Sequence, residues 1–166
     1  MTAQNVIEMR KVTKIFGEFV ANDQIDLQVR KGEIHALLGE NGAGKSTLMN
    51  MLSGLLEPTS GEILVNGELE KIDSPSKASK LGIGMVHQHF MLVDAFTVTE
   101  NIILGNETVH GGKLDIKKAE KEILELSQKY GLEVKPDALV RDINVGQQQR
   151  VEILKLIARD AKIMVL

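Results

Sequence analysis

Residues 39–47 form a glycine-rich segment with the spacing G-x-x-x-x-G-K-[ST]; they read Gly39-Glu40-Asn41-Gly42-Ala43-Gly44-Lys45-Ser46-Thr47. An apolar run that we expect to be a strand, residues 33–38, precedes this segment, and a good helix former, residues 45–52, follows it. Glycines let successive backbone N–H groups turn towards one anion, and the following helix adds its positive N-terminal end. The segment therefore predicts a phosphate-binding loop between a strand and a helix of an α/β domain.

The polar side chains of this loop suit a nucleotide. Lys45 is predicted to supply a cation for the β- and γ-phosphates, and Ser46 to offer its hydroxyl to Mg²⁺. The rest of 39–47 is predicted to line the phosphates. A glycine-rich turn that binds nothing is the alternative, but the motif, the strand and the helix all agree. We therefore expect a nucleotide and Mg²⁺ as cofactors.

Two other classes of nucleotide protein fit less well. A GTP-binding switch needs an Asn-Lys-x-Asp motif to read its base, and the chain has none. A small-molecule kinase should carry an arginine-rich lid, whereas the only arginines after Arg30 are Arg141, Arg150 and Arg159.

Turn and cap signals divide the remaining chain into short elements. Strands are expected over residues 6–12, 25–29, 62–65, 68–69, 83–86 and 163–166, with Asn66-Gly67 as a type I′ hairpin turn. Helices are expected to start after the Ser74 N-cap, to cover a stripe of apolar residues from Ile116 to Tyr130, and to run from about 146 to 159. We predict three parts: a nucleotide-binding core with an antiparallel β piece (1–96), an inserted helical subdomain (97–145), and a helix with a final core strand (146–166).

The composition of the chain excludes several kinds of site and partner. The chain has 166 residues, 43% of them apolar, a formal net charge of -3 and no cysteine. Disulfides and thiolate metal sites are excluded, and the scattered lysines and arginines argue against nucleic acid as a partner. No basic segment followed by an apolar one opens the chain, and no apolar run approaches the ~20 residues of a membrane helix. We expect a soluble protein of the cytoplasm that could still dock on a membrane partner.

Four segments, in order along the chain, resemble the landmarks of one family. They are Phe16 in Lys14-Ile-Phe-Gly17, the loop at 39–47, Gln88 in Met85-Val-His-Gln-His-Phe90, and 143–150, which reads Ile-Asn-Val-Gly-Gln-Gln-Gln-Arg. The chain is similar to the nucleotide-binding subunits of ATP-binding cassette (ABC) transporters. Its amino-acid sequence around Gln88 and after Gly146 is similar to the sequences of sugar and nucleoside importers in particular.

This resemblance implies a role for each landmark. Phe16 would stack on the adenine of ATP, and Gln88 would reach Mg²⁺ and the attacking water. The segment after Gln88 would contact the transmembrane permease subunits at the cytoplasmic face of the membrane, and a second cassette and, indirectly, a solute-binding protein would complete the assembly. From the residues alone, Phe16 could instead be a core aromatic, Gln88 a solvated loop residue, and residues 90–93 either core or an exposed docking patch. His87 and His89 fit pocket or packing residues better than a metal site.

Two departures from the family pattern concern the partner surface and the catalytic carboxylates. Where the family has LSGGQ, this chain has Ile143, Asn144, Val145, Gly146 and Gln147, so an amide replaces the serine and a β-branched residue replaces the first glycine. Residues 163–166 resemble the Walker B strand, which an aspartate and a glutamate follow in the family. We expect an ATPase in the intact protein but no turnover by these residues alone. A regulatory or mechanical cassette without a transport role, or a non-catalytic binding fragment, are the alternatives.

Overall fold

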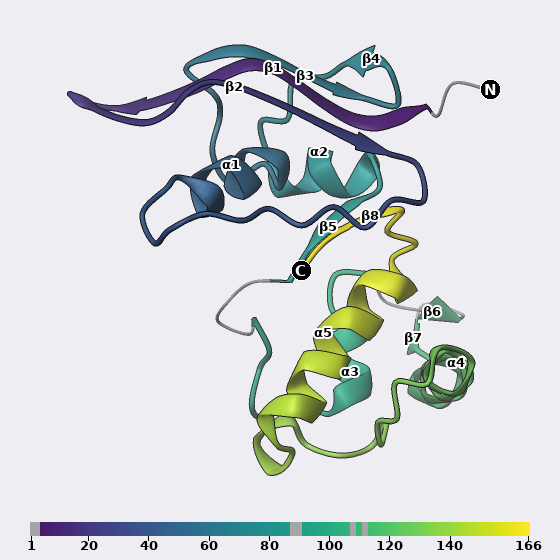
Figure 1. Cartoon of the computed structure of the whole chain (residues 1–166). Coiled ribbons are helices and arrows are strands. Elements are labelled where there is room, and N and C mark those ends of the chain that lie inside the picture. Colours follow the sequence, from purple (N-terminus) through teal and green to yellow (C-terminus); the bar gives the residue numbers. More distant parts are fainter. Residues whose placement is uncertain (1–3, 87–90, 107–108, 111–112) are drawn as a thin grey trace. The chain divides into compact units, whose positions relative to one another are not determined.

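The computed structural model of the chain describes residues 4–86, 91–106, 109–110 and 113–166 (Figure 1). The chain divides into two compact units, Met1–Ile83 and Gly84–Leu166.

The first unit is built on an antiparallel sheet in the order β2-β1-β3-β4, and its two helices lie on one face of this sheet (Figure 1). The elements are β1 (Asn5–Phe16), β2 (Phe19–Arg30), α1 (Lys45–Leu52), β3 (Ser60–Val65), β4 (Glu68–Leu69) and α2 (Pro75–Lys80). Alternate apolar residues of β1, namely Ile7 and Met9, point to the helices and are buried with Leu48 and Met51 of α1. The strands and the helix expected at these positions are confirmed.

Local turn chemistry explains where these elements begin and end. Asn66 and Gly67 have φ angles of 53° and 87°, as a type I′ turn between β3 and β4 requires. The hydroxyl of Ser74 accepts a hydrogen bond from the N–H of Lys77 and caps α2, whose first residue is Pro75. Gly54, with φ of 74°, follows the end of α1. The sequence analysis predicted the turn at Asn66-Gly67 and the N-cap at Ser74, and Gly54 is a typical residue after a helix end.

The prediction of a strand over residues 33–38 is wrong. After the turn at Gly32 the chain holds no regular element up to the loop, and all of 33–40 is exposed; Ile34 is 100% and Leu38 88% exposed. A strand exists only as a member of a hydrogen-bonded ladder, and none of the strands described in this unit pairs with the segment. The apolar composition and the length of residues 33–38 show only that this segment can pair with another strand. They do not show that a partner strand is present, so the prediction failed.

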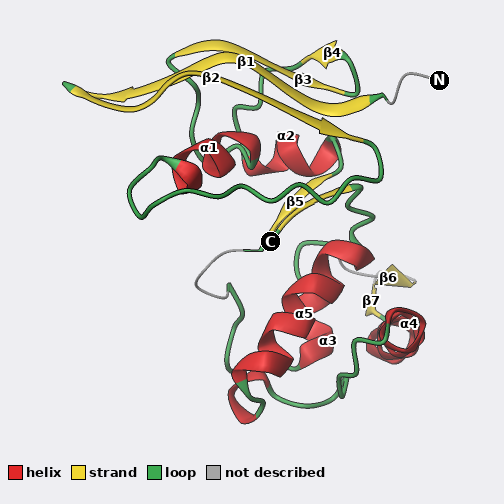
Figure 2. Ribbon diagram, viewed as in Figure 1, coloured by secondary structure: helices red, strands yellow, loops and turns green. Residues whose placement is uncertain are grey.

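The second unit is mainly helical (Figure 2). Its helices are α3 (Val98–Ile103), α4 (Ile116–Tyr130) and α5 (Val145–Ala158), with a 3-10 turn at Val140–Asp142. Their shared core consists of seven buried residues: Val98, Ile102, Ile103, Ala119, Ile123, Val151 and Leu154. The helical stripe predicted from Ile116 to Tyr130 is confirmed as α4, and Gly131 follows it in the left-handed conformation.

Four short strands, in two pairs, accompany these helices. β5 (Ile83–Met85), which starts at the boundary of the two units, and β8 (Ile163–Val165) form a two-stranded sheet, as expected for two apolar runs. A small hairpin of β6 (Val109–His110) and β7 (Lys113–Leu114) was not predicted; two-residue strands carry too little pattern to be read. The domain boundaries at 96/97 and 145/146 stay a prediction. Among the described residues, no helix combines the length and the apolar character needed to cross a bilayer.

Candidate functional site

The N-terminal end of α1 differs from the start of every other α-helix in the described residues. Its N-cap is Gly44, in the left-handed conformation with φ of 81°, and no side chain caps it. The other four α-helices are capped by Ser74, Thr97, Asp115 and Asn144. The first helical N–H groups, those of Lys45, Ser46 and Thr47, have no partner within a helix, because the first helical bond runs from Leu48 to Gly44. This end of α1 therefore presents free donors to an external acceptor.

The side chain of Lys45 closes the loop on itself. Its Nζ donates to the carbonyl oxygens of Gly39, at 2.7 Å, and Glu40, at 2.8 Å. The N–H of Ala43 also donates to the Glu40 carbonyl, at 3.2 Å. An ammonium has three N–H donors, and within the described residues this one uses two. The third donor and the positive charge stay available beside the free end of α1, so the arrangement fits a phosphate group.

Gly44 is held against strand β2 so closely that no side chain fits. A Cβ at this position would lie 2.4 Å from the carbonyl oxygen of Ala21 and 2.6 Å from Nδ2 of Asn22. That amide nitrogen donates to the Gly44 carbonyl at 3.2 Å. Asn22 is 5% exposed, and its Oδ1 is the one buried side-chain oxygen or nitrogen without a partner in the described residues. Sequence reasoning missed Asn22, which lies outside the strand expected over residues 25–29.

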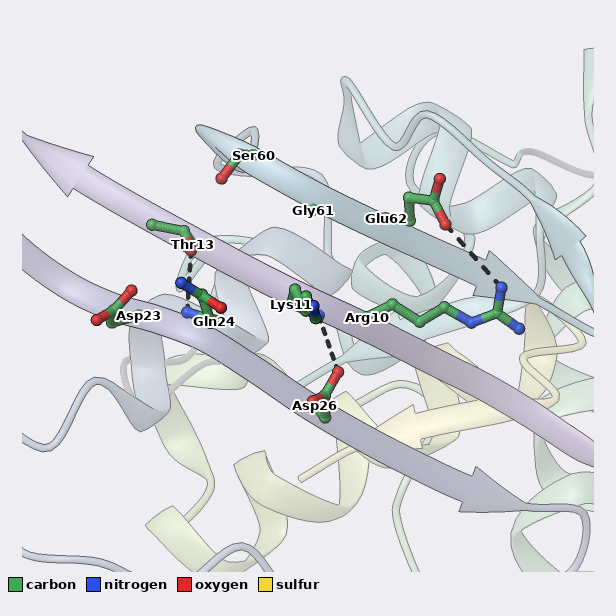
Figure 3. A pocket seen from close by; sticks show the side chains of 9 residues that line it. All are labelled: Arg10, Lys11, Thr13, Asp23, Gln24, Asp26, Ser60, Gly61 and Glu62. Carbon is green, nitrogen blue, oxygen red and sulfur yellow. Dashed lines mark hydrogen bonds and ion pairs between the residues drawn. The ribbon is translucent and has the colours of Figure 1, made fainter.

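Two irregularities of the sheet precede this contact. Lys11 on β1 and Gln24 on β2 are non-glycine residues with φ of 46°, and the strand registers shift beside them. Side chains replace the missing ladder partners: the N–H of Lys11 donates to Asp26, and the N–H of Gln24 to the Thr13 hydroxyl, each at 2.9 Å (Figure 3). Bulges of this kind bend a strand and change the direction of the residues that follow. The bulge at Gln24 lies two residues from Asn22.

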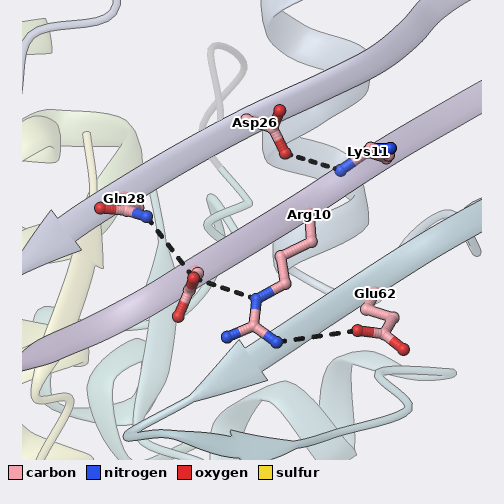
Figure 4. Close-up of polar contacts among 6 residues, drawn as sticks. Arg10, Lys11, Asp26, Gln28 and Glu62 are labelled. Atoms are coloured by element: carbon pink, nitrogen blue, oxygen red, sulfur yellow. Dashed lines mark hydrogen bonds and ion pairs between the residues drawn. The ribbon is translucent and has the colours of Figure 1, made fainter.

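The outer face of the sheet carries charges of both signs beside these bulges (Figure 4). Arg10 donates to Glu8 at 3.0 Å and lies 4.0 Å from Glu62 on β3. The hydrogen bond to Glu8, with its charge, raises the pKa of the Arg10 guanidinium. Exposed ion pairs of this kind stabilise weakly, and none of these side chains belongs to residues 39–47.

Phe16 lies at the end of β1, beside the two-residue turn that joins it to β2. It pairs with Phe19 across the strands and is 45% exposed, so its ring does not belong to the core. Nζ of Lys14 lies 5.2 Å from the centroid of its ring. An open aromatic face with a cation nearby can accept a stacked base.

The signature positions form a helix start of a different kind. Oδ1 of Asn144 accepts from the N–H of Gln147 at 2.9 Å, and Oε1 of Gln147 accepts from the N–H of Asn144 at 3.1 Å. This reciprocal capping box begins α5. Nδ2 of Asn144 makes no hydrogen bond to any described residue, and Val145 is 68% exposed. Gly146 follows within the first turn.

Gln88, His87 and His89 lie outside the described residues. Within the residues that are described, no three His, Cys, Asp or Glu side chains come together as metal ligands. Of the two residues expected to hold Mg²⁺, Ser46 and Gln88, only Ser46 is described. It is exposed in the first turn of α1.

The chain resembles proteins of known function along almost its whole length. It is 72% identical over 165 residues to the nucleoside import ATP-binding protein NupA of Lactococcus lactis, a match that covers 99% of this chain and 33% of NupA. It is 61% identical over 160 residues to the guanosine import ATP-binding protein NupO of Bacillus subtilis, covering 96% of this chain and 31% of NupO. The chain thus spans about a third of the length of these curated relatives.

Solved structures give the same fold. A nucleotide-free ATP-binding cassette from an ABC transporter superposes with a TM-score of 0.79 at 26% identity, over 96% of this chain and 67% of that one. A dimeric cassette bound to ADP and Pi gives a TM-score of 0.75 at 27% identity, over 95% of this chain and 72% of that one. The predicted P-loop cassette fold, with its antiparallel β subdomain, is confirmed. The family model described as ABC transporter matches residues 22–166, and the chain belongs to this family.

Proposed function

We propose that this chain is the ATP-binding part of an importer, and that it binds Mg-ATP through residues 39–47. The observation that carries the proposal is the uncapped start of α1, where free N–H groups and the Lys45 ammonium lie together. Backbone donors at a helix N-terminus, together with a lysine, recognise the phosphates of a nucleotide. Glu40, Asn41 and Gly42 lie on the exposed side of the same loop.

We assign the base and the metal to three residues within the landmarks of the sequence. Phe16 stacks on the adenine ring, and its exposure supports this role. Ser46 and Gln88 hold the Mg²⁺, which neutralises charge on the phosphates during their transfer. Gln88 also orients the attacking water.

The partners follow from two surfaces. Residues 144–147 meet the nucleotide of a second cassette, with the free amide of Asn144 as donor. The segment after Gln88 contacts the transmembrane permease subunits, since Met91 and Val93 expose apolar side chains there. The protein would act at the cytoplasmic face of the membrane, with a solute-binding protein reaching it only through the permease.

The cargo we propose is a nucleoside, with sugars as the neighbouring class. Two of the curated relatives are named for nucleoside and guanosine import, and others for ribose and xylose import. A transported solute does not touch an ATP-binding subunit, so this proposal rests on relatedness and not on the site.

We further propose that residues 1–166 bind ATP without hydrolysing it. Glu40 is the only carboxylate within 39–47. Hydrolysis depends on charge and on positioned water, so it needs further carboxylates that we assign to the rest of a longer protein.

Titration with a fluorescent ATP analogue tests ATP binding. We expect Lys45→Ala to lose most of the affinity, and Lys80→Ala, an exposed lysine of α2 away from the loop, to keep it. Equal binding by the wild type and Lys45→Ala would refute the site. Purification of the intact protein with its membrane subunits separates a transporter from a regulatory cassette, which would purify without them.

A further inference from the structure

The short segment 91–93 of the second unit is held by side chains and not by a sheet. The N–H of Met91 donates to Oε1 of Glu152 on α5 at 3.1 Å, and Nζ of Lys155, also on α5, donates to the Met91 carbonyl at 3.4 Å. Two residues on, the N–H of Val93 donates to Oδ1 of Asn101 at 2.7 Å, and Nδ2 of Asn101 donates back to the Val93 carbonyl at 3.1 Å. Both backbone groups of both residues are thus satisfied by α3 and α5.

The side chains that make these contacts are buried polar groups. Glu152 is 3% exposed and Asn101 is fully buried, and the neighbouring residues on α5 include the core residues Val151 and Leu154. A carboxylate is almost never buried without a partner, and an apolar residue at position 152 would fill the same core at lower desolvation cost. Burial also lowers the pKa of the Lys155 ammonium, which Glu152 partly offsets. The buried Glu152 therefore serves something other than packing.

The contacts leave the outward side chains free. Leu92 packs on the core of the unit, whereas Met91 is 65% and Val93 38% exposed. The segment thus presents two apolar side chains from a backbone fixed on both sides. The helix that fixes Met91, α5, begins at the signature positions 144–147.

We propose that Glu152 is a positioning residue that couples the exposed segment 91–93 to α5, so that a permease subunit pressing on Met91 and Val93 acts on the signature end of that helix. The proposal rests on the function proposed above, because it requires a membrane subunit to occupy this surface. Asn101 holds the segment to α3 in the same way. Neither residue belongs to the segments assigned to nucleotide above.

The test compares Glu152→Met, which keeps volume but removes the acceptor, with Glu152→Gln, which keeps an acceptor oxygen. In the whole ATP-binding protein, hydrogen exchange at the Met91 amide should quicken about tenfold or more in Glu152→Met, and by much less in Glu152→Gln, because exchange follows local opening. Exchange at Val93, which Asn101 holds, should change less.

The same proteins are then assembled with their membrane subunits in vesicles. Glu152→Met should keep its ATP affinity and its basal hydrolysis but lose most of the stimulation by transported solute, and Glu152→Gln should recover the stimulation. Normal stimulation in Glu152→Met, or unchanged exchange at Met91, would overturn the coupling. A wild type that binds no ATP or is never stimulated would instead refute the proposed function, and the coupling with it, so the two failures are distinguishable.

Discussion

The amide nitrogen of Asn22 donates a hydrogen bond to the carbonyl oxygen of Gly44 at 3.2 Å, and so ties strand β2 to the start of α1. The Gly44 carbonyl also accepts from the N–H of Leu48 at 2.9 Å, so it keeps a partner if Asn22 is lost. Oδ1 of Asn22 is buried without a partner among the described residues. Such an oxygen destabilises the fold, so Asn22 contributes less to stability than to the position of the loop.

Asn22→Leu should separate stability from ligand affinity. The lost hydrogen bond costs about 0.5–1.5 kcal/mol, and removal of the unpaired oxygen recovers a similar amount, so the free energy of unfolding should change by less than ~1 kcal/mol. ATP affinity should fall several-fold because Gly44 loses its tether. Urea unfolding and ATP titration measure the two quantities. Gln28→Leu on the exposed side of β2 is the control and should change neither; wild-type affinity in Asn22→Leu would count against the tether.

Gly44 and Gly42 provide a matched pair for the close approach of β2. Both have positive φ, 81° and 86°, so alanine at either position costs about 1–2 kcal/mol of backbone strain. Only at Gly44 does the new Cβ also meet the Ala21 carbonyl and the Asn22 amide. Gly44→Ala should therefore lower the free energy of unfolding by at least ~1 kcal/mol more than Gly42→Ala. Equal urea midpoints for the two variants would show that β2 moves away from the new Cβ without lowering the free energy of unfolding.

Phe16 and Phe19 face each other across one hairpin, and only Phe16 is assigned to the base. Stacking tolerates any base, so ATP and GTP should compete within about tenfold, or ~1.4 kcal/mol. Phe16→Ala should weaken both nucleotides, by about 1–3 kcal/mol for the loss of one stacked ring. Phe19→Ala, which removes a more exposed ring, should weaken neither. Competition titrations give the affinities of the wild type and both variants for ATP and GTP. A strong preference for ATP that survives Phe16→Ala would reject stacking.

Local chemistry made most of the fold predictable. Helix 45–52, the Asn66-Gly67 turn and the Ser74-Pro75 helix start each depend on residues within a few positions of one another. The free donors at the start of α1 were predictable for the same reason, since they come from consecutive residues. That they bind the phosphates of ATP stays a prediction from chemistry and from resemblance together.

The features that were missed depend on partners far along the chain. Residues 33–38 have the composition of a strand but no ladder partner in their unit. Asn22 is 22 residues from Gly44, and Glu152 is 61 from Met91. A single sequence does not say which distant backbone group an amide or a carboxylate will meet. Position 152, an acidic residue directly between Val151 and Ile153, was a visible signal that did not enter the prediction.

Two roles of the Asn144 side chain, capping α5 and contacting a second cassette, can be tested separately. Its Oδ1 caps the helix, while its Nδ2 has no partner among the described residues and is the group assigned to the second cassette's nucleotide. Asp caps a helix as well as Asn does, so Asn144→Asp should keep the free energy of unfolding, whereas Asn144→Ala should lose about 1 kcal/mol.

The two variants should nevertheless agree in their effect on ATP-dependent association with a second cassette. Asn144→Asp replaces the free donor with a negative charge that repels phosphate, and Asn144→Ala removes the donor, so association measured by light scattering should weaken in both, and more in the aspartate variant. Asp115→Asn, at the N-cap of α4, changes a cap of the same kind in the same unit and should leave association unchanged. If Asn144→Asp associates as the wild type does, the amide of Asn144 does not meet the nucleotide, and its role is confined to starting α5.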